Sequence, residues 1–343
     1  MDIATLVPLP VRISPEVWRW DTDDGRLGAG VAVCADMGLL VISARNRLQV
    51  FVLPEDIVAR CHLGTRRDLV PVRTLGGVAP MEFGFYNDSG CMAFADGCEA
   101  TTALLLVTDT GISGCGTVHV IDVVRGTHVG YVAAPGTIRS PQGVATQNSL
   151  AAVSSHTSVR VFEGSGATWT SVRTITVATN IGGLRFTADG LGLVVPEYYH
   201  GGLRVFSVTA EDNSPCSDVE QLHYPLDVEE WDICPDGDGG MRAGWVVCDY
   251  RGLVAVSGTN EKAKRRGLGF YPFALAVVPG LGLLMARHDT GVQFFAAPDA
   301  VAMAAMSLCK VAWMVAVCRG LVASAATARR SHDGDDQETY RFS

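Results

Sequence analysis

Three histidines occupy comparable positions in three polar turns of the sequence: His156, His200 and His288. Three neutral imidazoles around an open coordination position form a ligand set suited to catalytic Zn²⁺. The three turns differ in length, however, and nothing in the spacing shows that the side chains meet. Independent surface histidines are therefore the favoured interpretation, and no bound metal or other cofactor is expected. A metal-dependent lyase or hydrolase is the alternative function.

Other motifs that could support catalysis are incomplete. "GISGCG" from Gly111 is not followed by the Gly-Lys-Ser/Thr of a phosphate-binding loop, and "PDGDGG" from Pro235 lacks the spaced ligands and final Glu of a calcium loop. No Gly-x-Ser-x-Gly nucleophile elbow occurs. The sequence therefore favours a protein that is not an enzyme.

The polar turns carry aromatic and charged side chains besides the histidines. Tyr and Arg often anchor protein interfaces because they combine a large contact area with directional hydrogen bonds. If the turns share one face of the fold, this face is a candidate surface for binding a protein or peptide; solvated turns without a ligand are the alternative. The predicted residues are Arg45, Arg47, Asp109, His156, Glu197, Tyr198, Tyr199, His200, Asp249, Tyr250, Arg251, Arg287 and His288.

The elements that would position these turns form six similar units. Each unit has an apolar run, a turn rich in Gly, Asp or Asn, a second run, a polar turn and a third run. The units begin near Gly30, Ala103, Ser140, Gly183, Trp231 and Phe273. A repeat of about 40–50 residues is typical of propeller blades, and short β-branched runs between Gly turns are typical of strands. We therefore predict an all-β fold, a six-bladed β-propeller with four-stranded antiparallel blades. Residues 90–102 are interpreted as a loop insertion.

A ring of blades must close on itself, and the sixth unit lacks an outer strand after Pro298. "IATLVPLPVRI" from Ile3 is a β-like stretch that no other unit uses. We expect residues 1–15 to complete the last blade, which places the propeller domain at residues 1–297. An extended amino-terminal arm is the alternative.

One unit resembles a known repeat. Pro141-x-Gly143-Val144-Ala145, followed by Asn148 and by "VRVF" from Val159, is similar to the NHL repeat, with its Pro-x-Gly-Val-Ala-Val and Arg-Val-Gln-Val-Phe segments. "GVAV" from Gly30, "NRLQVF" from Asn46 and "LRVF" from Leu203 match the pattern too. The resemblance covers about residues 26–297 and implies a propeller.

The sequence also departs from the NHL pattern. The Asp expected after the second run occurs only as Asp109 and Asp249, and Cys34 or Thr146 replaces the Asp expected after "GVAV". The family includes RNA-binding modules, ubiquitin-ligase-associated modules, extracellular sensor domains and an amidating lyase with metal-binding histidines. None of these activities follows from the repeat itself, because a fold does not determine a function.

The carboxyl-terminal region has a different composition. Residues 298–330 are rich in Ala and Met and predict a long helix, with Asp299 as a candidate N-cap. Its apolar part, residues 301–326, is long enough to span a membrane. Lys310 near the middle opposes this by about 2.5–3.5 kcal/mol, so packing against protein is favoured. Residues 331–343 are polar and acidic, which predicts a disordered tail.

Composition narrows the choice of partner and compartment. The formal charge of −9 disfavours broad nucleic-acid binding, without excluding a local basic patch. The ten cysteines include no Cys-x-x-Cys pair, and the first residues lack the basic and apolar regions of a signal peptide. We therefore expect an intracellular, cytoplasmic protein, and the favoured function is a non-catalytic scaffold that binds a protein or peptide.

Overall fold

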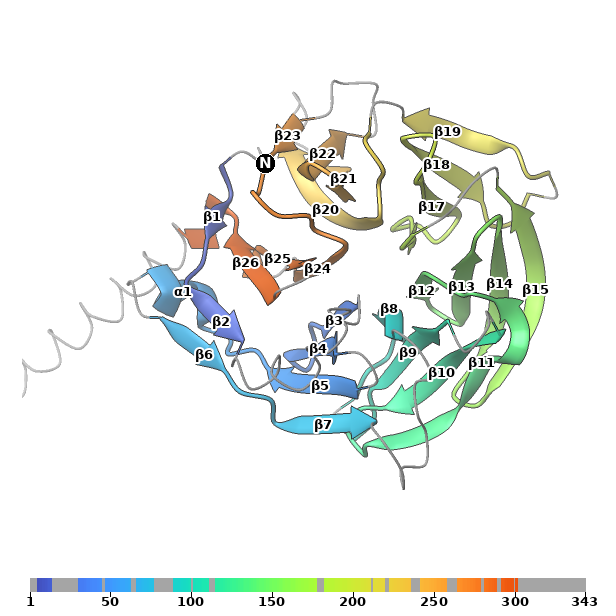
Figure 1. The fold of residues 1–343 in the computed structure, drawn as a ribbon, viewed down its shortest axis with the longest axis horizontal. Helices are drawn as coiled ribbons and strands as arrows, with labels where there is room; N and C mark the ends of the chain where they lie inside the picture. Colours follow the sequence, from blue (N-terminus) through green and yellow to red (C-terminus); the bar gives the residue numbers. More distant parts are fainter. Residues whose placement is uncertain are drawn as a thin grey trace, which may run out of the picture.

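The chain folds into six four-stranded antiparallel sheets arranged as blades around a central axis (Figure 1). This confirms the predicted all-β, six-bladed β-propeller. The computed structural model describes residues 5–13, 30–44, 47–62, 66–76, 89–99, 101–110, 115–177, 182–210, 212–219, 222–235, 241–257, 264–278, 281–288, 291–298 and 300–301.

Each blade runs from an inner strand near the axis to an outer strand at the rim. Blade 1 comprises β3 (Val31–Cys34), β4 (Leu39–Ala44), β5 (Arg47–Val52) and β7 (Arg73–Gly76). Blade 2 comprises β8 (Ser89–Phe94), β9 (Leu104–Asp109), β10 (Cys115–Asp122) and β11 (Thr127–Arg139). Blade 3 comprises β12 (Val144–Gln147), β13 (Leu150–Ser155), β14 (Ser158–Ser165) and β15 (Thr168–Thr176).

The second half of the ring follows the same plan. Blade 4 comprises β16 (Arg185–Phe186), β17 (Gly192–Glu197), β18 (Gly202–Ser207) and β19 (Pro215–Val219). Blade 5 comprises β20 (Asp227–Pro235), β21 (Met241–Asp249), β22 (Gly252–Ser257) and β23 (Lys264–Arg266). Blade 6 comprises β24 (Ala274–Val278), β25 (Leu283–His288), β26 (Gly291–Ala296) and β1 (Val7–Pro8). Outside the blades, β2 (Val11–Ile13) pairs in parallel with β6 (Arg67–Leu69), near helix α1 (Ile57–His62) (Figure 1).

Among the described residues, the hydrophobic core forms six clusters, each between two neighbouring blades. Leu48 of blade 1 and Val107 of blade 2, for example, belong to one cluster, and Val194 of blade 4 and Val247 of blade 5 belong to another. The second strand of a blade is covered on both faces, so its sequence is a continuous apolar run rather than an alternating pattern. The six residues of β17 are all buried. The blades therefore stabilise one another around the whole ring.

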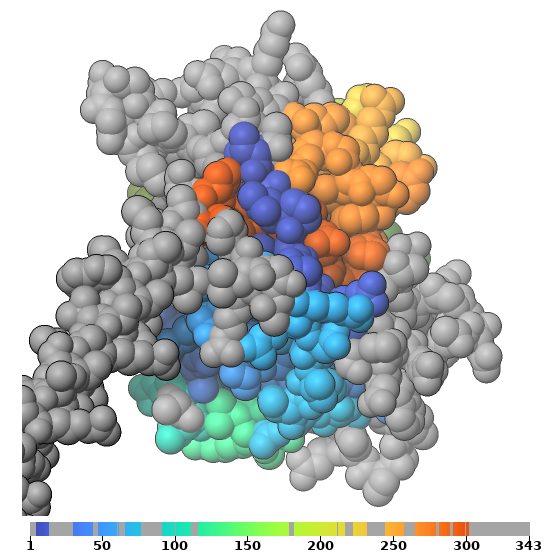
Figure 2. Space-filling view, turned by 90° about the vertical axis from the view of Figure 1, so that its left-hand side faces the viewer, coloured from blue at the N-terminus to red at the C-terminus, as the bar shows by residue number. Residues whose placement is uncertain are grey.

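The amino-terminal strand supplies the outer strand of blade 6. Val7 of β1 lies opposite Ala296 of β26, and the backbone N–H of Leu9 donates to the carbonyl of Phe294 at 2.9 Å. The guanidinium of Arg266 donates to the carbonyl of Leu6 at 2.5 Å. In Figure 2 the amino-terminal segment (blue) lies against strands from the carboxyl-terminal part of the ring (orange). The two ends of the propeller thus share one sheet.

Blade 2 begins earlier than the sequence pattern predicts. Residues 90–102 are not a loop insertion throughout, because Ser89–Phe94 form the inner strand of the blade, β8. Met92 and Ala93 of this strand are buried. The apolar run that marks β8 extends only from Cys91 to Phe94, and a register shift between Ser89 and Met92 interrupts the pairing of β8 with β9. The pattern is therefore too short to identify as a strand.

Most of the predicted carboxyl-terminal helix lies outside the described residues, as does the tail at 331–343. At its start, the backbone N–H of Val301 donates to the carbonyl of Ala297 at 3.1 Å, and the Val301 side chain is buried in the cluster between blades 6 and 1. In the described part of the chain, no helix has the length and apolar character needed to cross a membrane. Residues 302–326 fall outside that part.

Candidate protein-binding face

Five tyrosines from two turns and two connections between blades form a continuous row on one face of the propeller. In each blade, the turn between the second and third strands lies on the same face as the connections between blades, because the strands alternate in direction. The row, called the tyrosine arc below, comprises Tyr198, Tyr199, Tyr224, Tyr250 and Tyr271.

The rings of the tyrosine arc contact one another in sequence. Tyr198 packs edge-on against Tyr199 with centroids 5.0 Å apart, and it lies 4.9 Å from Tyr224. Tyr224 is nearly perpendicular to Tyr250 at 6.0 Å, and Tyr250 stacks on Tyr271 at 4.4 Å with an interplanar angle of 21°. Edge-to-face and offset-stacked geometries at such distances are favourable for aromatic pairs. The arc is therefore held by its own contacts.

The tyrosine arc is open to solvent. The exposed fractions are 66% for Tyr199, 45% for Tyr224, 46% for Tyr250 and 57% for Tyr271. A hydrogen bond with Tyr271 raises the pKa of the Tyr250 hydroxyl above its ordinary value. Adjacent exposed aromatic side chains on a folded protein commonly mark an interaction site.

Backbone hydrogen bonds fix the loops that carry the arc. The connection before blade 5 runs beside the β21–β22 turn: Leu226 N–H donates to the carbonyl of Cys248, and Tyr250 N–H donates to the carbonyl of His223, each at 2.9 Å. Tyr224 has a φ of 54°, in the left-handed region that residues other than glycine seldom adopt. Such a conformation persists only where the surrounding structure holds it, and it is common at functional sites.

Asp249 holds the two central loops of the arc together from beneath. Its side chain is fully buried, and its carboxylate accepts hydrogen bonds from His223 N–H at 2.7 Å and from Arg251 N–H at 2.8 Å. The guanidinium of Arg265, on the outer strand of the same blade, donates at 2.8 Å. The sequence pattern predicts Asp249 on the exposed face, whereas in the structure it lies below that face and positions the loops above it.

Glu197 occupies the corresponding position in blade 4. It is also fully buried, and its carboxylate lies 3.2 Å from Nε of Arg204. The turn that follows brings Gly201 close to the next connection, where Leu222 N–H donates to the Gly201 carbonyl at 2.8 Å. A Cβ at Gly201 would lie 2.4 Å from the Leu222 carbonyl oxygen, and its φ is +67°. This position therefore requires glycine.

Two more predicted site residues are buried. Arg287 is fully enclosed, where its guanidinium donates to the carbonyl of Gly291 at 3.2 Å and lies 5.9 Å from the ring centre of Phe273. Asp109 is fully buried in blade 2, with His119 Nε2 at 3.6 Å from its carboxylate. Neither side chain is available to a partner on the surface.

The remaining predicted residues are spread around the ring. His156 is exposed on blade 3, 3.5 Å from the Gln142 amide, and His288 is half-buried against the Phe270 ring at 4.3 Å. His200 and Arg251 are exposed beside the tyrosine arc, and Arg47 is half-buried on blade 1. Arg45 lies outside the described residues. Within the described ranges, which include His156, His200 and His288, no group of three or more His, Cys, Asp or Glu side chains could hold a metal ion.

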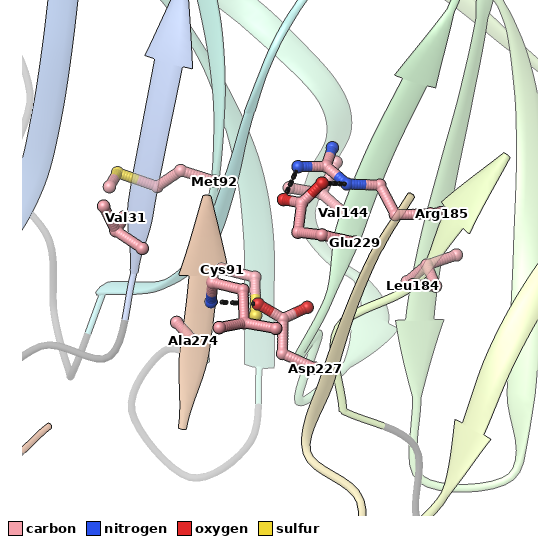
Figure 3. Close-up of a pocket in the computed structure, with 10 residues that line it drawn as sticks. Val31, Cys91, Met92, Val144, Leu184, Arg185, Asp227, Glu229 and Ala274 are labelled. Atoms are coloured by element: carbon pink, nitrogen blue, oxygen red, sulfur yellow. Dashed lines mark hydrogen bonds and ion pairs between the residues drawn. The ribbon is translucent and has the colours of Figure 1, made fainter. Parts of the chain in front are cut away.

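A second group of polar residues lines the central channel (Figure 3). The inner strands surround about 250 Å³ of space that atoms do not fill, part of it open to solvent. Arg185 forms a two-point ion pair with Glu229, with Nε at 2.7 Å from Oε2. The Asp227 carboxylate accepts the backbone N–H groups of Leu275 and Val228 at 2.8 and 2.9 Å.

Burial gives the channel groups unusual titration behaviour. Desolvation, together with the nearby negative charge of Glu229, raises the pKa of Asp227 to about 7. Desolvation also raises the pKa of the Cys91 thiol above its ordinary value. The hydrogen bond from Leu275, on blade 6, makes Asp227 of blade 5 a link between these two blades. Arg185 and Glu229 satisfy each other, and two backbone N–H groups satisfy Asp227, as expected for a structural cluster.

Sequence reasoning identifies part of the tyrosine arc. Tyr198, Tyr199 and Tyr250 are predicted because they follow second strands, but Tyr224 and Tyr271 are missed because they lie in the connections between blades. A signal is present: Tyr224-Pro225 and Tyr271-Pro272 both precede an inner strand, and both prolines are buried. The recurrence of Tyr-Pro at the same place in two units identifies the missing rings.

No protein-family model and no curated protein matches this sequence. Among solved structures, 1188 chains match, so the fold is too common to select a function. One such chain belongs to a structure titled "Crystal Structure of Mitotic Checkpoint Complex". It aligns over 80% of this chain and 91% of its own, with a TM-score of 0.52 and 11% identity. At that identity the likeness shows a shared propeller fold alone.

Proposed function

We propose that this protein is a non-catalytic scaffold that binds a protein partner through the tyrosine arc. The observation that carries this proposal is the row of four strongly exposed tyrosines in mutual contact across blades 4 to 6. Tyrosine is enriched among the residues that dominate binding energy at protein interfaces. A tyrosine presents a large amphipathic surface and has few side-chain torsions to immobilise.

The rigidity of the loops supports the same proposal. Association is weakened by the entropy lost when flexible side chains and loops become ordered. In this protein the ring contacts, the backbone bonds between the loops and the buried Asp249 already order the surface before a partner arrives. The solved structure with the shared fold is titled as a complex, and this chain, too, is proposed to act within an assembly.

We also propose that the blades are NHL-type repeats. The glycine of the motif has the same environment in two blades: Gly30 N–H donates to Ser43 Oγ and Gly143 N–H donates to Ser154 Oγ, each at 2.7 Å. A Cβ at Gly143 would lie 2.3 Å from the carbonyl oxygen of Gly182. The close approach at Gly143 gives a structural reason for glycine there, and Gly30 shares its hydrogen bond.

An intracellular, cytoplasmic location is part of the proposal. Thiols stay reduced in that compartment, and disulfides are uncommon there. In the part of the chain that the structure describes, the following cysteines are free: Cys34, Cys61, Cys91, Cys98, Cys216 and Cys248.

The scaffold function is tested by quantitative affinity capture from a native extract. The variant Tyr250→Ala with Tyr271→Ala removes the stacked pair of the arc. Tyr131→Ala is the control, since Tyr131 is 38% exposed on the outer strand of blade 2, away from the arc. We expect wild type and the control to recover the same partners and the arc variant to lose them. Equal recovery by all three proteins, with equal melting temperatures, would show that the arc is not the binding site.

A further inference from the structure

The tyrosine arc is a single narrow row of rings rather than a broad patch. Consecutive ring centroids from Tyr199 to Tyr271 are 4.4–6.0 Å apart, so the row measures about 20 Å when followed from ring to ring. An extended peptide advances about 3.3 Å per residue, and the arc would therefore accommodate roughly six residues. A narrow row of this length matches one linear segment of a partner.

In the part of the arc that the structure describes, the exposed charges are of one sign. The exposed ionisable side chains in its described loops, apart from the tyrosines, are Arg251, His200 and His223. Among the described residues of these loops, the acidic side chains are Glu197 and Asp249, which are buried and paired with Arg204 and Arg265. Because these arginines neutralise the two buried carboxylates, Arg251 dominates the surface potential of the described loops at neutral pH. The described residues of the arc's loops are therefore locally basic, although the whole chain carries a charge of −9.

The arc offers donors for both the backbone and the side chains of a peptide. Tyrosine hydroxyl groups can donate to the carbonyls of an extended backbone, while the rings contact apolar side chains. A guanidinium pairs with a carboxylate through two parallel hydrogen bonds and discriminates against a positively charged segment. Resting on the proposed function of the same face, we propose that the tyrosine arc binds an extended acidic peptide segment that carries apolar or aromatic anchors.

A single-stranded nucleic acid is a poorer match to these features. Its bases require free aromatic faces for stacking and a basic groove that follows the phosphates. Tyr250 and Tyr271 already cover one face of each other, and one exposed arginine with two histidines provides little phosphate neutralisation. The acidity of the whole chain opposes a polyanion at longer range. Nucleic acid is therefore included as the competing ligand in the test.

The test measures fluorescence anisotropy of labelled probes with the full-length chain. The probes are octapeptides in which Phe and Pro alternate with Glu, matched octapeptides with Gln or Lys in place of Glu, and an eight-nucleotide oligouridylate. We expect the Glu peptides to bind most tightly and the Lys peptides least tightly. Binding of the Glu peptides should weaken as salt is added, because the screening length between exposed charges falls from about 10 Å at 0.1 M to about 3 Å at 1 M.

Two substitutions separate the contributions of charge and of the rings. Arg251→Glu should weaken binding of the Glu peptides by about tenfold or more and strengthen binding of the Lys peptides. Tyr250→Ala with Tyr271→Ala should weaken every peptide, on the order of thirtyfold, as for hot-spot residues. Arg139→Glu makes the same charge change at an exposed site on the outer strand of blade 2 and should have no effect on any probe.

The outcomes distinguish this inference from the proposed function. Equal affinity for the Glu and Lys peptides, or preferential binding of oligouridylate, would overturn the acidic-peptide proposal. If affinity capture still depended on the arc tyrosines in that case, the scaffold function would stand with a different partner. Peptide binding that is unchanged by the double tyrosine variant would place the site elsewhere and overturn both proposals.

Discussion

Closure of the ring by the amino-terminal strand predicts unequal effects for two substitutions two residues apart. Leu9 is 4% exposed and packs in the core cluster between blades 6 and 1, whereas Val7 is 37% exposed on the same segment. Truncating a buried leucine to alanine removes its apolar contacts and leaves a cavity, which costs about 2–5 kcal/mol of folding free energy. Val7→Ala should cost less than about 1 kcal/mol, because much of that side chain is already in water.

The measurement is thermal unfolding of full-length protein, followed by calorimetry and by tryptophan fluorescence. At about 2.1 cal/mol/K of unfolding entropy per residue, the loss at Leu9→Ala should lower the melting temperature of this chain by roughly 3–7 °C, and Val7→Ala should lower it by no more than about 2 °C. Neither change alters the backbone bond from Leu9 to Phe294, so the difference reports side-chain packing. Deleting residues 1–15 should lower the melting temperature further, since it also exposes the edge of β26.

Equal shifts for the two point variants would refute the reasoning, because the strand would then not be anchored through its buried face. A melting temperature unchanged by the deletion would contradict closure itself. In that case β26 would have to be stable as an unpaired edge.

Three further predictions concern the loops and the channel. Asp249→Ala should lower the free energy of unfolding by about 3–5 kcal/mol, because it leaves Arg265 and two backbone N–H groups without their acceptor. Asp249→Asn should lower it less, and chemical denaturation measures both effects. Gly201→Ala should also lower the melting temperature, because the φ of this residue is positive and the added Cβ would meet the Leu222 carbonyl. Gly136→Ala, where the added Cβ has open space around it, should lower the melting temperature less. The pKa of Asp227 is about 7 in the folded protein and about 3.8 in the unfolded chain. Its contribution to the free energy of unfolding is therefore complete below pH 3.8 and is lost as the pH rises to 7. Denaturation at several pH values should show this slope in wild type and a smaller one in Asp227→Asn; identical slopes would contradict the raised pKa.

The strand pattern of the sequence is sufficient to predict the blades. Second strands such as β17 are covered on both faces, so they read as continuous apolar runs between glycine-rich turns. β8 escapes the pattern because its apolar run extends only from Cys91 to Phe94 and its pairing with β9 shifts register, while Met92 packs in the cluster between blades 1 and 2. Tertiary contacts of this kind leave a weak local signal.

The candidate site is predicted less completely, for a related reason. A turn position indicates which face a residue is on, but it does not show whether the side chain points outward. Arg287 is held inward by two carbonyl acceptors: Gly291, on the next strand of the blade, at 3.2 Å, and Ser43, 244 residues away along the chain, at 3.5 Å. Asp109 turns inward toward His119. The neighbours of Tyr224 and Tyr271 are likewise set by the packing of adjacent blades, which a single unit of the repeat does not specify.

The shared sheet of blade 6 has a consequence for synthesis on the ribosome. Leu9 and Gln293, whose side-chain amide donates to the Leu9 carbonyl at 3.4 Å, are 284 residues apart. At a synthesis rate of about 5–20 residues per second, roughly 15–60 s pass between synthesis of the amino-terminal strand and synthesis of its partner β26. During that interval Leu6 and Leu9 lack the blade 6 side of their binding sites, and blades 1 to 5 assemble as an open chain with exposed apolar faces at both ends. We therefore expect a chaperone to bind the exposed apolar faces of the nascent propeller until the last blade is made.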